Sequence, residues 1–176
     1  MDETMDFMKL AAERYSVRQF SSEMVEQSKI DKILKAGHLA PTACNIQPQR
    51  ILVINSAEGI AKIRKCTVCH FNAPMAMLVC YDKNECWKRE YDGKNSGDID
   101  ASIVTTHMIL EAYALGVGTT WVMHFIPEAV REEFAIPEHM EPVALLMMGY
   151  PSEDAKPFPG HSKFRPMEEI VSYNDF

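Results

Sequence analysis

The segment RYSVRQF, residues 14–20, carries two arginines with a serine between them. A guanidinium group can bind two phosphate oxygens at once, and a serine hydroxyl can add another hydrogen bond. Arg14, Ser16 and Arg18 are therefore candidates for holding a phosphate group. Two arginines that follow a helix more often form a solvated surface, so the segment alone leaves both interpretations open.

A second candidate segment, APTACNIQPQR, spans residues 40–50. Its small residues permit close approach of a ligand, and its two prolines stiffen the backbone. The side chains of Thr42, Asn45 and Gln47 offer paired donors and acceptors that suit a flat heterocycle with imide-like edges. The alternative is an ordinary turn whose side-chain amides bind their own backbone.

The third segment, GHSKFRPMEEIV, spans residues 160–171 and brings Lys163 and Arg165 into an acidic chain. The formal net charge of −7 argues against a general nucleic-acid-binding role, because such a role needs a basic face. An anionic ligand would need a local cluster of cations set against the overall charge. Cations beside a helix are common, so this pair alone is also consistent with plain surface.

The pattern Cys66-x-x-Cys69-His70 is that of covalent haem attachment, and it is also compatible with a metal or redox site. The nearest further candidates, Cys80 and Cys86, form no second C-x-x-C pair, whereas a structural zinc site needs four closely spaced ligands. Haem of this type belongs to exported proteins, and the N-terminal residues lack the apolar core of a signal peptide. We therefore expect no haem or metal, and instead a helix end with two buried or half-buried thiols.

The elements that would position these segments are a mixture of helices and strands. Helices are expected near 4–14, 26–39, 57–66, 98–115 and 127–134, with a closing helical turn at 166–173. Strands are expected at 50–55, 75–81, 118–125 and 141–150. Several of these strands are near-continuous apolar runs, which indicates a sheet covered on both faces. The length of 176 residues favours one domain, residues 1–176.

The long helix expected at 98–115 has Asp98 as a candidate N-cap and Gly116 as a candidate stop. Between Ala101 and Gly116, only Glu111 is formally charged. A helix that is apolar most of the way round is buried on more than one side. It is either part of a subunit interface or the core helix of a monomer.

Taken in order and spacing, these motifs resemble the FMN-dependent nitroreductase family, which includes NAD(P)H-dependent nitroreductases and NADH oxidase-like flavoproteins. RYSVRQF is similar to the phosphate motif of the family, and APTACNIQP resembles its Ala-Pro-Ser-x-x-Asn-x-Gln-Pro loop. LGVGTTWV at 115–122, MGYP at 148–151 and FRPMEEIV at 164–171 are similar to its later segments. The resemblance covers nearly the whole chain.

The resemblance implies an α+β three-layer sandwich, with a mixed, mostly antiparallel sheet flanked by helices. It also implies an intertwined homodimer with two FMN molecules in interface clefts. Residues at both ends of the chain would hold the phosphate and the nearby ribityl chain, a loop would reach the flavin from the partner subunit, and a backbone segment would pass beside the reactive N5. The residues implied to hold the phosphate and the ribityl chain are Arg14, Tyr15, Ser16, Arg18, Lys163 and Arg165. The loop residues implied to reach the flavin are Pro41, Thr42, Ala43, Asn45 and Gln47. The backbone segment implied beside N5 is Val122, Met123 and His124.

The activity implied by the resemblance is a ping-pong reaction in which NADH or NADPH gives a hydride to flavin N5. An electron-poor acceptor, such as a nitroaromatic or a quinone, then takes it. The flavin carries the chemistry, so no side chain is expected to be catalytic. The alternatives are an FMN-binding protein with a sensing or storage role, and a specialised flavin reaction.

The chain departs from the family at three places. Gln49 follows the Gln-Pro pair where many relatives have tryptophan, and Met123-His124 stands where larger relatives have Glu-Gly. Cys66 and Cys69 occupy the places of an asparagine and a lysine that reach the pyrimidine edge of the flavin. We therefore expect the Cys66–His70 stretch to lie close to the flavin without the usual polar contacts.

The remaining expectations concern the segment 82–97 and the location of the protein in the cell. The polar segment 82–97 holds Trp87 and Tyr91, and it is either a mobile lid over the site or a plain surface excursion. The absence of a membrane-spanning apolar run and the five cysteines favour the reducing cytoplasm. No nucleic-acid or membrane partner is expected.

Overall fold

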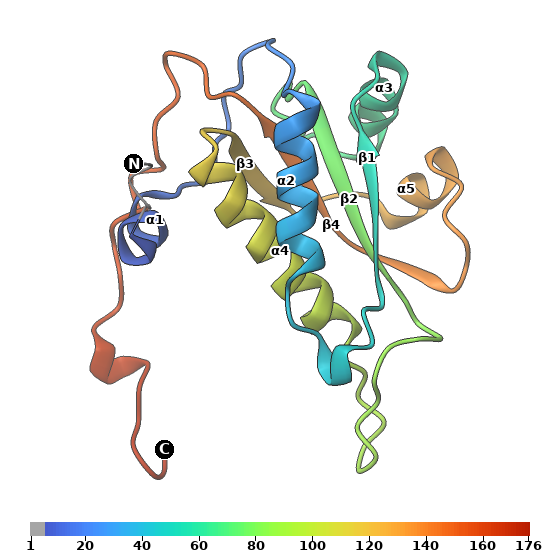
Figure 1. Ribbon diagram of the computed structural model, residues 1–176, viewed down its shortest axis with the longest axis vertical. Helices are drawn as coiled ribbons and strands as arrows, with labels where there is room; N and C mark the ends of the chain where they lie inside the picture. The colour runs from blue at the N-terminus through green and yellow to red at the C-terminus, as the bar shows by residue number, and fades with distance from the viewer. Residues whose placement is uncertain (1–5) are drawn as a thin grey trace.

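The computed structural model describes residues 6–176 and shows three layers, with helices on both faces of an antiparallel sheet (Figure 1). The order of the strands across the sheet is β1-β2-β4-β3. The strands are β1 (Gln49–Ile54), β2 (Met75–Asp82), β3 (Gly118–Val122) and β4 (Met140–Gly149). The helices are α1 (Phe7–Glu13), α2 (Gln27–His38), α3 (Ala57–Cys66), α4 (Gly97–Ala114) and α5 (Pro127–Glu133), with 3₁₀ turns η1 (Ala43–Asn45) and η2 (Met167–Glu169).

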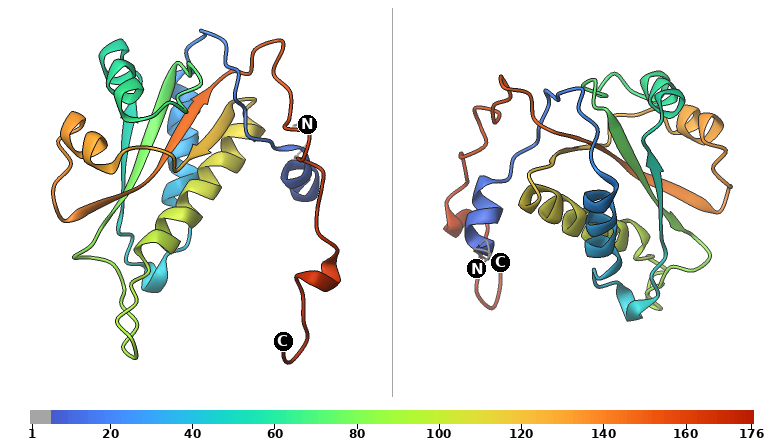
Figure 2. Two further views of the ribbon diagram at one scale, coloured as in Figure 1. Left: turned by 180° about the vertical axis from the view of Figure 1, so that it is seen from behind. Right: turned by 45° about the horizontal axis from the view of Figure 1, so that its top comes forward.

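The central strands β2 and β4 are buried on both faces, as their continuous apolar runs predicted. Met77 and Val79 of β2 pack toward α2 and α4, while the alternate residues Ala76 and Leu78 pack toward α3 and α5. Each face therefore has its own hydrophobic core, and Figure 2 shows the sheet between the two helical layers.

The predicted mixture of strand directions was wrong for this sheet. Every neighbouring pair of its strands is antiparallel. Within residues 6–176, the one parallel bridge is an isolated one, between Ser16 and Thr119 of β3. The Val17 amide donates to the Thr119 carbonyl at 2.9 Å, but the chain then leaves the edge of β3 before a parallel strand can form.

The long helix α4 begins at Gly97, so Asp98 is not its N-cap. Ser96 occupies that position, and the Asn95 side-chain oxygen accepts from the Gly97 amide at 3.0 Å. The predicted stop at Gly116 is confirmed, because this residue adopts a left-handed φ of 75°. The amides of Gly116 and Val117 donate to the carbonyls of the last turn of the helix.

One side of α4 packs on the sheet and α2, through residues such as Ala101, Val104 and Met108. The opposite side is only partly covered: Ile99 is 54% exposed, and Leu110 is half-buried. A core helix of a monomer would be covered all round. The apolar outer side of α4 therefore lacks a counterpart within residues 6–176 of one chain.

The last segment, residues 152–176, runs past α1 and away from the sandwich (Figures 1 and 2); we call it the C-terminal arm. The predicted closing helical turn at 166–173 is present as the shorter turn η2. The arm exposes several large hydrophobic side chains: Phe158, Phe164, Met167, Ile170, Tyr173 and Phe176.

Two other predicted elements are shorter than expected. The helix expected from residue 4 begins at Phe7, and residues 4 and 5 lie outside the described part of the chain. The strand expected over 118–125 ends at Val122, because the Phe125 amide donates to the Met123 carbonyl in a turn. Among residues 6–176, no helix is long and apolar enough to cross a membrane.

Gly97 is the position in α4 where a substitution should damage the fold most. A methyl group on its α-carbon would overlap the buried ring of Tyr81. Gly97→Ala is therefore expected to cost about 1–3 kcal/mol of unfolding free energy, which lowers the Tm by about 2–10 °C. Thermal unfolding by circular dichroism measures this, with the exposed neighbour Asp98→Ala as control. Equal melting of Gly97→Ala and wild type would show that Tyr81 moves aside freely.

Candidate functional site

A cavity of about 250 Å³ lies where the chain between α1 and α2 meets α4 and β3. Its lining residues are Arg14, Ser16, Thr106, Ile109, Leu110, Thr119 and Trp121. The bond from the Val17 amide to Thr119 and the bond from the Thr120 hydroxyl to the Val17 carbonyl hold this segment against β3. The predicted phosphate residues Arg14 and Ser16 therefore share one cavity.

Arg18 is exposed, and its guanidinium donates to the Ser16 carbonyl at 3.2 Å. It therefore supports the backbone of the segment 14–18, and it is not among the residues that line the cavity.

The C-terminal arm returns to the other side of this segment. The Tyr15 and His161 rings meet edge to face with centroids 6.3 Å apart, and a His161 ring nitrogen lies 3.1 Å from the Ala12 carbonyl. The Lys163 amide donates to the Gly160 carbonyl, so Lys163 belongs to the same turn as His161. The α-carbons of residues 161 and 163 are thus within about 7 Å of each other. The C-terminal arm therefore contacts the segment that follows α1.

Arg165 forms an ion pair with Glu169. Its guanidinium lies 3.6 Å from the Glu169 carboxylate, and both side chains are exposed. An exposed pair of this kind contributes little, about 0–1 kcal/mol, so Arg165 can leave Glu169 at small cost.

The loop 41–47 lies at the other end of α4, beside its first turn (Figure 1). Three of its residues, Cys44, Asn45 and Gln47, have left-handed φ values of 50°, 53° and 58°. Residues other than glycine adopt this conformation at a cost of about 1–3 kcal/mol each, and such residues are frequent at ligand-binding sites. The Thr42 hydroxyl accepts from the Gln47 amide at 3.0 Å, and the exposed Asn45 forms the tip.

The loop and the cavity do not meet within one chain. The loop contacts α4 at Asp100, whereas the cavity contacts this helix from Thr106 to Leu110, six to ten residues further along. At 1.5 Å per residue, these contacts lie about 9–15 Å apart along α4. One chain therefore brings Arg14 and Ser16 together in one cavity and sets the turn of Lys163 against the neighbouring Tyr15. It does not bring the loop residues Pro41, Thr42, Ala43, Asn45 and Gln47 to that cavity.

The remaining predicted segment, Val122–His124, follows β3 and contacts the Cys66–His70 stretch. The Thr67 hydroxyl donates to the His124 carbonyl, and the Ile126 amide donates to the Cys66 carbonyl at 2.9 Å. Val122 is buried, whereas Met123 and His124 are exposed. A second cavity, of about 180 Å³, lies between the two segments. Sequence reasoning missed Thr67, whose only signal was a polar residue between two cysteines.

The sequence profile of the nitroreductase family matches residues 11–74 and 69–150 of the chain. The chain belongs to the nitroreductase family. The predicted class of enzyme, an oxidoreductase of this family, is thereby confirmed. Residues 151–176 lie beyond the matched range, so the profile does not include Lys163 and Arg165.

Three relatives illustrate the range of this nitroreductase family. A solved nitroreductase-family protein of Clostridium difficile 630 is 45% identical to this chain and superimposes with a TM-score of 0.92. The superposition covers 98% of this chain and 100% of the other protein. An FMN-dependent nitroreductase of Clostridium difficile R20291 is 26% identical, with a TM-score of 0.79 and coverage of 97% and 100%. A protein of Archaeoglobus fulgidus, provisionally named an NADH dehydrogenase/NAD(P)H nitroreductase, is 31% identical over 90% of this chain and 93% of its own.

The Cys66–His70 stretch of this nitroreductase-family chain has the character of a structural segment. The Cys66 Sγ donates to the Lys62 carbonyl at 3.3 Å, and burial raises the pKa of its thiol. A redox-active pair needs the opposite shift, toward the thiolate. Within residues 6–176, no three or more His, Cys, Asp or Glu side chains lie close enough together to hold a metal ion.

The cysteines of this chain should differ sharply in their reaction with iodoacetamide. Burial raises the pKa of Cys80 to about 11, whereas Cys44 is exposed. At pH 9 the thiolate fraction of Cys80 should be roughly fiftyfold below that of an ordinary thiol, and it should rise with pH up to about 11. Mass spectrometry of the native protein should show Cys44 labelled first, with all five cysteines labelled in denaturant as control. Equal labelling of Cys44 and Cys80 at pH 9 would contradict the burial of Cys80.

Proposed function

We propose that this chain is an FMN-dependent oxidoreductase that uses NADH or NADPH to reduce an electron-poor small molecule, such as a nitroaromatic or a quinone. The observation that carries this proposal is the cavity that Arg14 and Ser16 line, in a segment whose Tyr15 contacts His161 of the C-terminal arm. The names of two relatives, an FMN-dependent nitroreductase and an NAD(P)H nitroreductase, give the cofactor and the co-substrate.

The residues present fit FMN. The guanidinium and hydroxyl groups in the cavity lining match a phosphate dianion, and no carboxylate among residues 6–176 lines the cavity. Ile109, Leu110 and Trp121 add an apolar wall that suits a flavin ring. Arg14, Ser16 and Lys163 would hold the phosphate, Tyr15 and Arg18 would support that segment, and Arg165 would join after leaving Glu169. Bound FMN supplies hydride transfer from NAD(P)H to the acceptor in a ping-pong sequence.

The functional unit we propose is a homodimer of a single FMN-binding domain. The cavity of about 250 Å³ is smaller than the ~300–1,000 Å³ pockets that enclose ligands of this size. The partner's loop 41–47 would supply the missing wall and would bring its Asn45 to the flavin. The uncovered side of α4 and the apolar arm provide the surfaces that would pack together. Five unpaired cysteines support a cytoplasmic location.

Spectroscopy of the purified protein tests this proposal. We expect a flavin absorption spectrum and release of FMN on denaturation. We also expect the flavin absorbance to bleach rapidly when the protein is mixed anaerobically with NADH or NADPH in a stopped-flow instrument. A tightly bound flavin that neither coenzyme reduces would favour the alternative of a sensing or storage protein. Failure to bind added FMN would overturn the proposal.

Segment 82–97 forms a narrow hairpin that projects from the start of α4 (Figure 1), and Tyr91 at its tip is 96% exposed. Lys88 and Asn95 pair across the hairpin, and Trp87 stands at its base. If this hairpin is a lid, Trp87→Ala should change kcat/KM about two- to tenfold for aromatic acceptors through lost stacking. The FMN dissociation constant should stay within about twofold. Steady-state kinetics with an aromatic and a non-aromatic acceptor would measure this, and an unchanged ratio would contradict the lid.

A further inference from the structure

Asp100 is a carboxylate buried in the first turn of helix α4, with only 2% of its surface exposed. Its Oδ1 accepts from the Ala43 amide at 2.9 Å, and its Oδ2 accepts from the Ser96 hydroxyl at 2.6 Å. A buried carboxylate is tolerated because both oxygens are paired and because the start of a helix favours negative charge. One side chain thus joins the loop 41–47 to the base of the hairpin.

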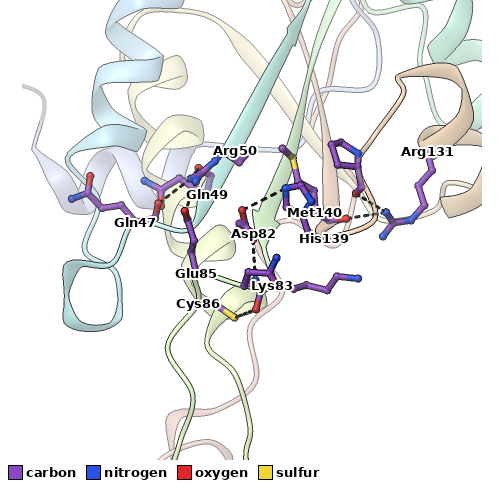
Figure 3. Close-up of polar contacts among 12 residues, drawn as sticks. Gln47, Gln49, Arg50, Asp82, Lys83, Glu85, Cys86, Arg131, His139 and Met140 are labelled. Carbon is purple, nitrogen blue, oxygen red and sulfur yellow. Dashed lines mark hydrogen bonds and ion pairs between the residues drawn. The ribbon is translucent and has the colours of Figure 1, made fainter.

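The opposite ends of the loop and the hairpin are also joined. The Arg50 guanidinium donates to the carbonyls of Gln47 and Gln49, at 3.3 and 2.9 Å, and it pairs with Glu85 (Figure 3). Glu85 stands where the first half of the hairpin begins, and Ser96 stands where the second half ends. The Ser96 amide donates to the Trp87 carbonyl, so the halves are themselves bonded together. The loop is therefore clamped to the hairpin at both ends.

The two clamps differ in strength. Arg50 and Glu85 are part-exposed, so solvent screens their attraction and each can exchange partners with water. Asp100 is buried, so loss of its carboxylate would leave the Ala43 amide and the Ser96 hydroxyl without partners. The strained residues Cys44, Asn45 and Gln47 need fixed neighbours to keep their left-handed backbone. Asp100 provides the fixed neighbour at the start of this loop.

We propose that Asp100 is a positioning residue for the flavin site: it fixes the loop 41–47 and transmits the position of the hairpin to that loop. This inference rests on the proposed function for the role of the loop toward FMN. Because the loop would reach the partner's flavin, Asp100 of one subunit sets the geometry of the other subunit's site. A ligand that contacts Trp87 on the hairpin would thereby influence how firmly the partner holds its flavin.

Hydrogen exchange of the FMN-free protein, read by mass spectrometry, tests the link itself. Asp100→Leu should speed amide exchange in residues 41–47 and in the hairpin base roughly ten- to hundredfold. Asp100→Asn should stay within about threefold of wild type, because its oxygen still accepts from Ala43 and its amide can donate to Ser96. Asp98→Ala, an exposed residue of the same turn, is the control.

Ser96→Ala removes only the hairpin side of the link and serves if Asp100→Leu fails to fold. It should still speed exchange in the loop 41–47, since the loop and the hairpin share Asp100. Fluorescence titration with FMN should show weaker binding for Asp100→Leu by roughly ten- to hundredfold, with recovery in Asp100→Asn.

Unchanged loop exchange in Asp100→Leu, or in Ser96→Ala where the former does not fold, would overturn the positioning role. Equal loss of FMN affinity in Asp100→Asn and Asp100→Leu would overturn it as well. If the exchange pattern is as expected and the wild-type protein binds no FMN, the link between loop and hairpin stands and the proposed function fails.

Discussion

Replacing Arg14 and Lys163 together by alanine is expected to weaken FMN binding by roughly two to four orders of magnitude. Arg14 lines the cavity, and Lys163 belongs to the same turn as His161, whose ring contacts the neighbouring Tyr15. Each would lose a charge-assisted hydrogen bond to phosphate, worth about 1.5–3 kcal/mol. Fluorescence titration of the FMN-free protein measures the change.

Riboflavin, which lacks the phosphate, is the matched ligand for this experiment. Its affinity should change far less than that of FMN, since the lost contacts are to the phosphate. Lys32→Ala, an exposed cation on α2, should leave both affinities unchanged. An equal loss for FMN and riboflavin would show that Arg14 and Lys163 act on the fold and not on the phosphate.

Removal of residues 153–176 of the C-terminal arm is expected to convert the proposed dimer to a monomer. The arm exposes large hydrophobic side chains, including Phe164, Met167 and Phe176, which residues 6–176 of the same chain leave uncovered. Burial of each such side chain on a partner contributes about 1.5–3 kcal/mol, which ordering of the arm offsets in part. We expect the dissociation constant of the dimer to rise at least about a thousandfold.

Sedimentation equilibrium of the truncated and full-length proteins measures this effect. Lys156→Ala, a charged and exposed residue of the arm, should leave the dimer intact. The truncated protein should retain its helical circular dichroism signal, because the arm contributes to neither hydrophobic core. A truncated protein that sediments as a dimer with the affinity of the full-length protein would show that the arm does not hold the subunits together.

Much of the fold could be predicted from the pattern of hydrophobic residues. Both faces of the sheet are covered by helices, so its central strands appear in the sequence as continuous apolar runs. The helix predicted at 57–66 is α3 with the same bounds, and the apolar run at 75–81 is nearly the whole of β2. Pro127 begins α5, as a proline at a first helical position indicates. These features depend on local pattern, which the sequence displays directly.

The errors arise where a distant contact decides the local structure. Asp98 was predicted as the cap of α4, but Ser96 occupies that position. The acidic side chain that is buried at the start of the helix is Asp100, which accepts hydrogen bonds from Ala43 and Ser96. The signal for Asp100 was a charge one turn into an apolar helix. The segment 14–18 meets β3 through one isolated bridge, too little for a parallel strand.

The sequence motifs indicated a set of candidate residues, but they did not show which of these lie together within one chain. The sequence motifs indicated both Arg14 and Asn45. The motifs do not show that the two residues lie near opposite ends of α4. The structure shows that Ser16 shares a cavity with Arg14, while Arg18 turns back to the Ser16 carbonyl. Such side-chain choices depend on the path of the backbone between α1 and α2.

The most direct test of the shared site is FMN binding by a mixed dimer. One copy carries Arg14→Ala and Lys163→Ala, and the other carries Asn45→Trp, which blocks the loop; each homodimer alone should bind no FMN at micromolar concentration. We expect the mixed dimer to bind one FMN with wild-type affinity. The copy with Asn45→Trp supplies an intact cavity with its cations, and the other copy supplies an intact loop. No recovery of binding in the mixed dimer would contradict a site built from two subunits.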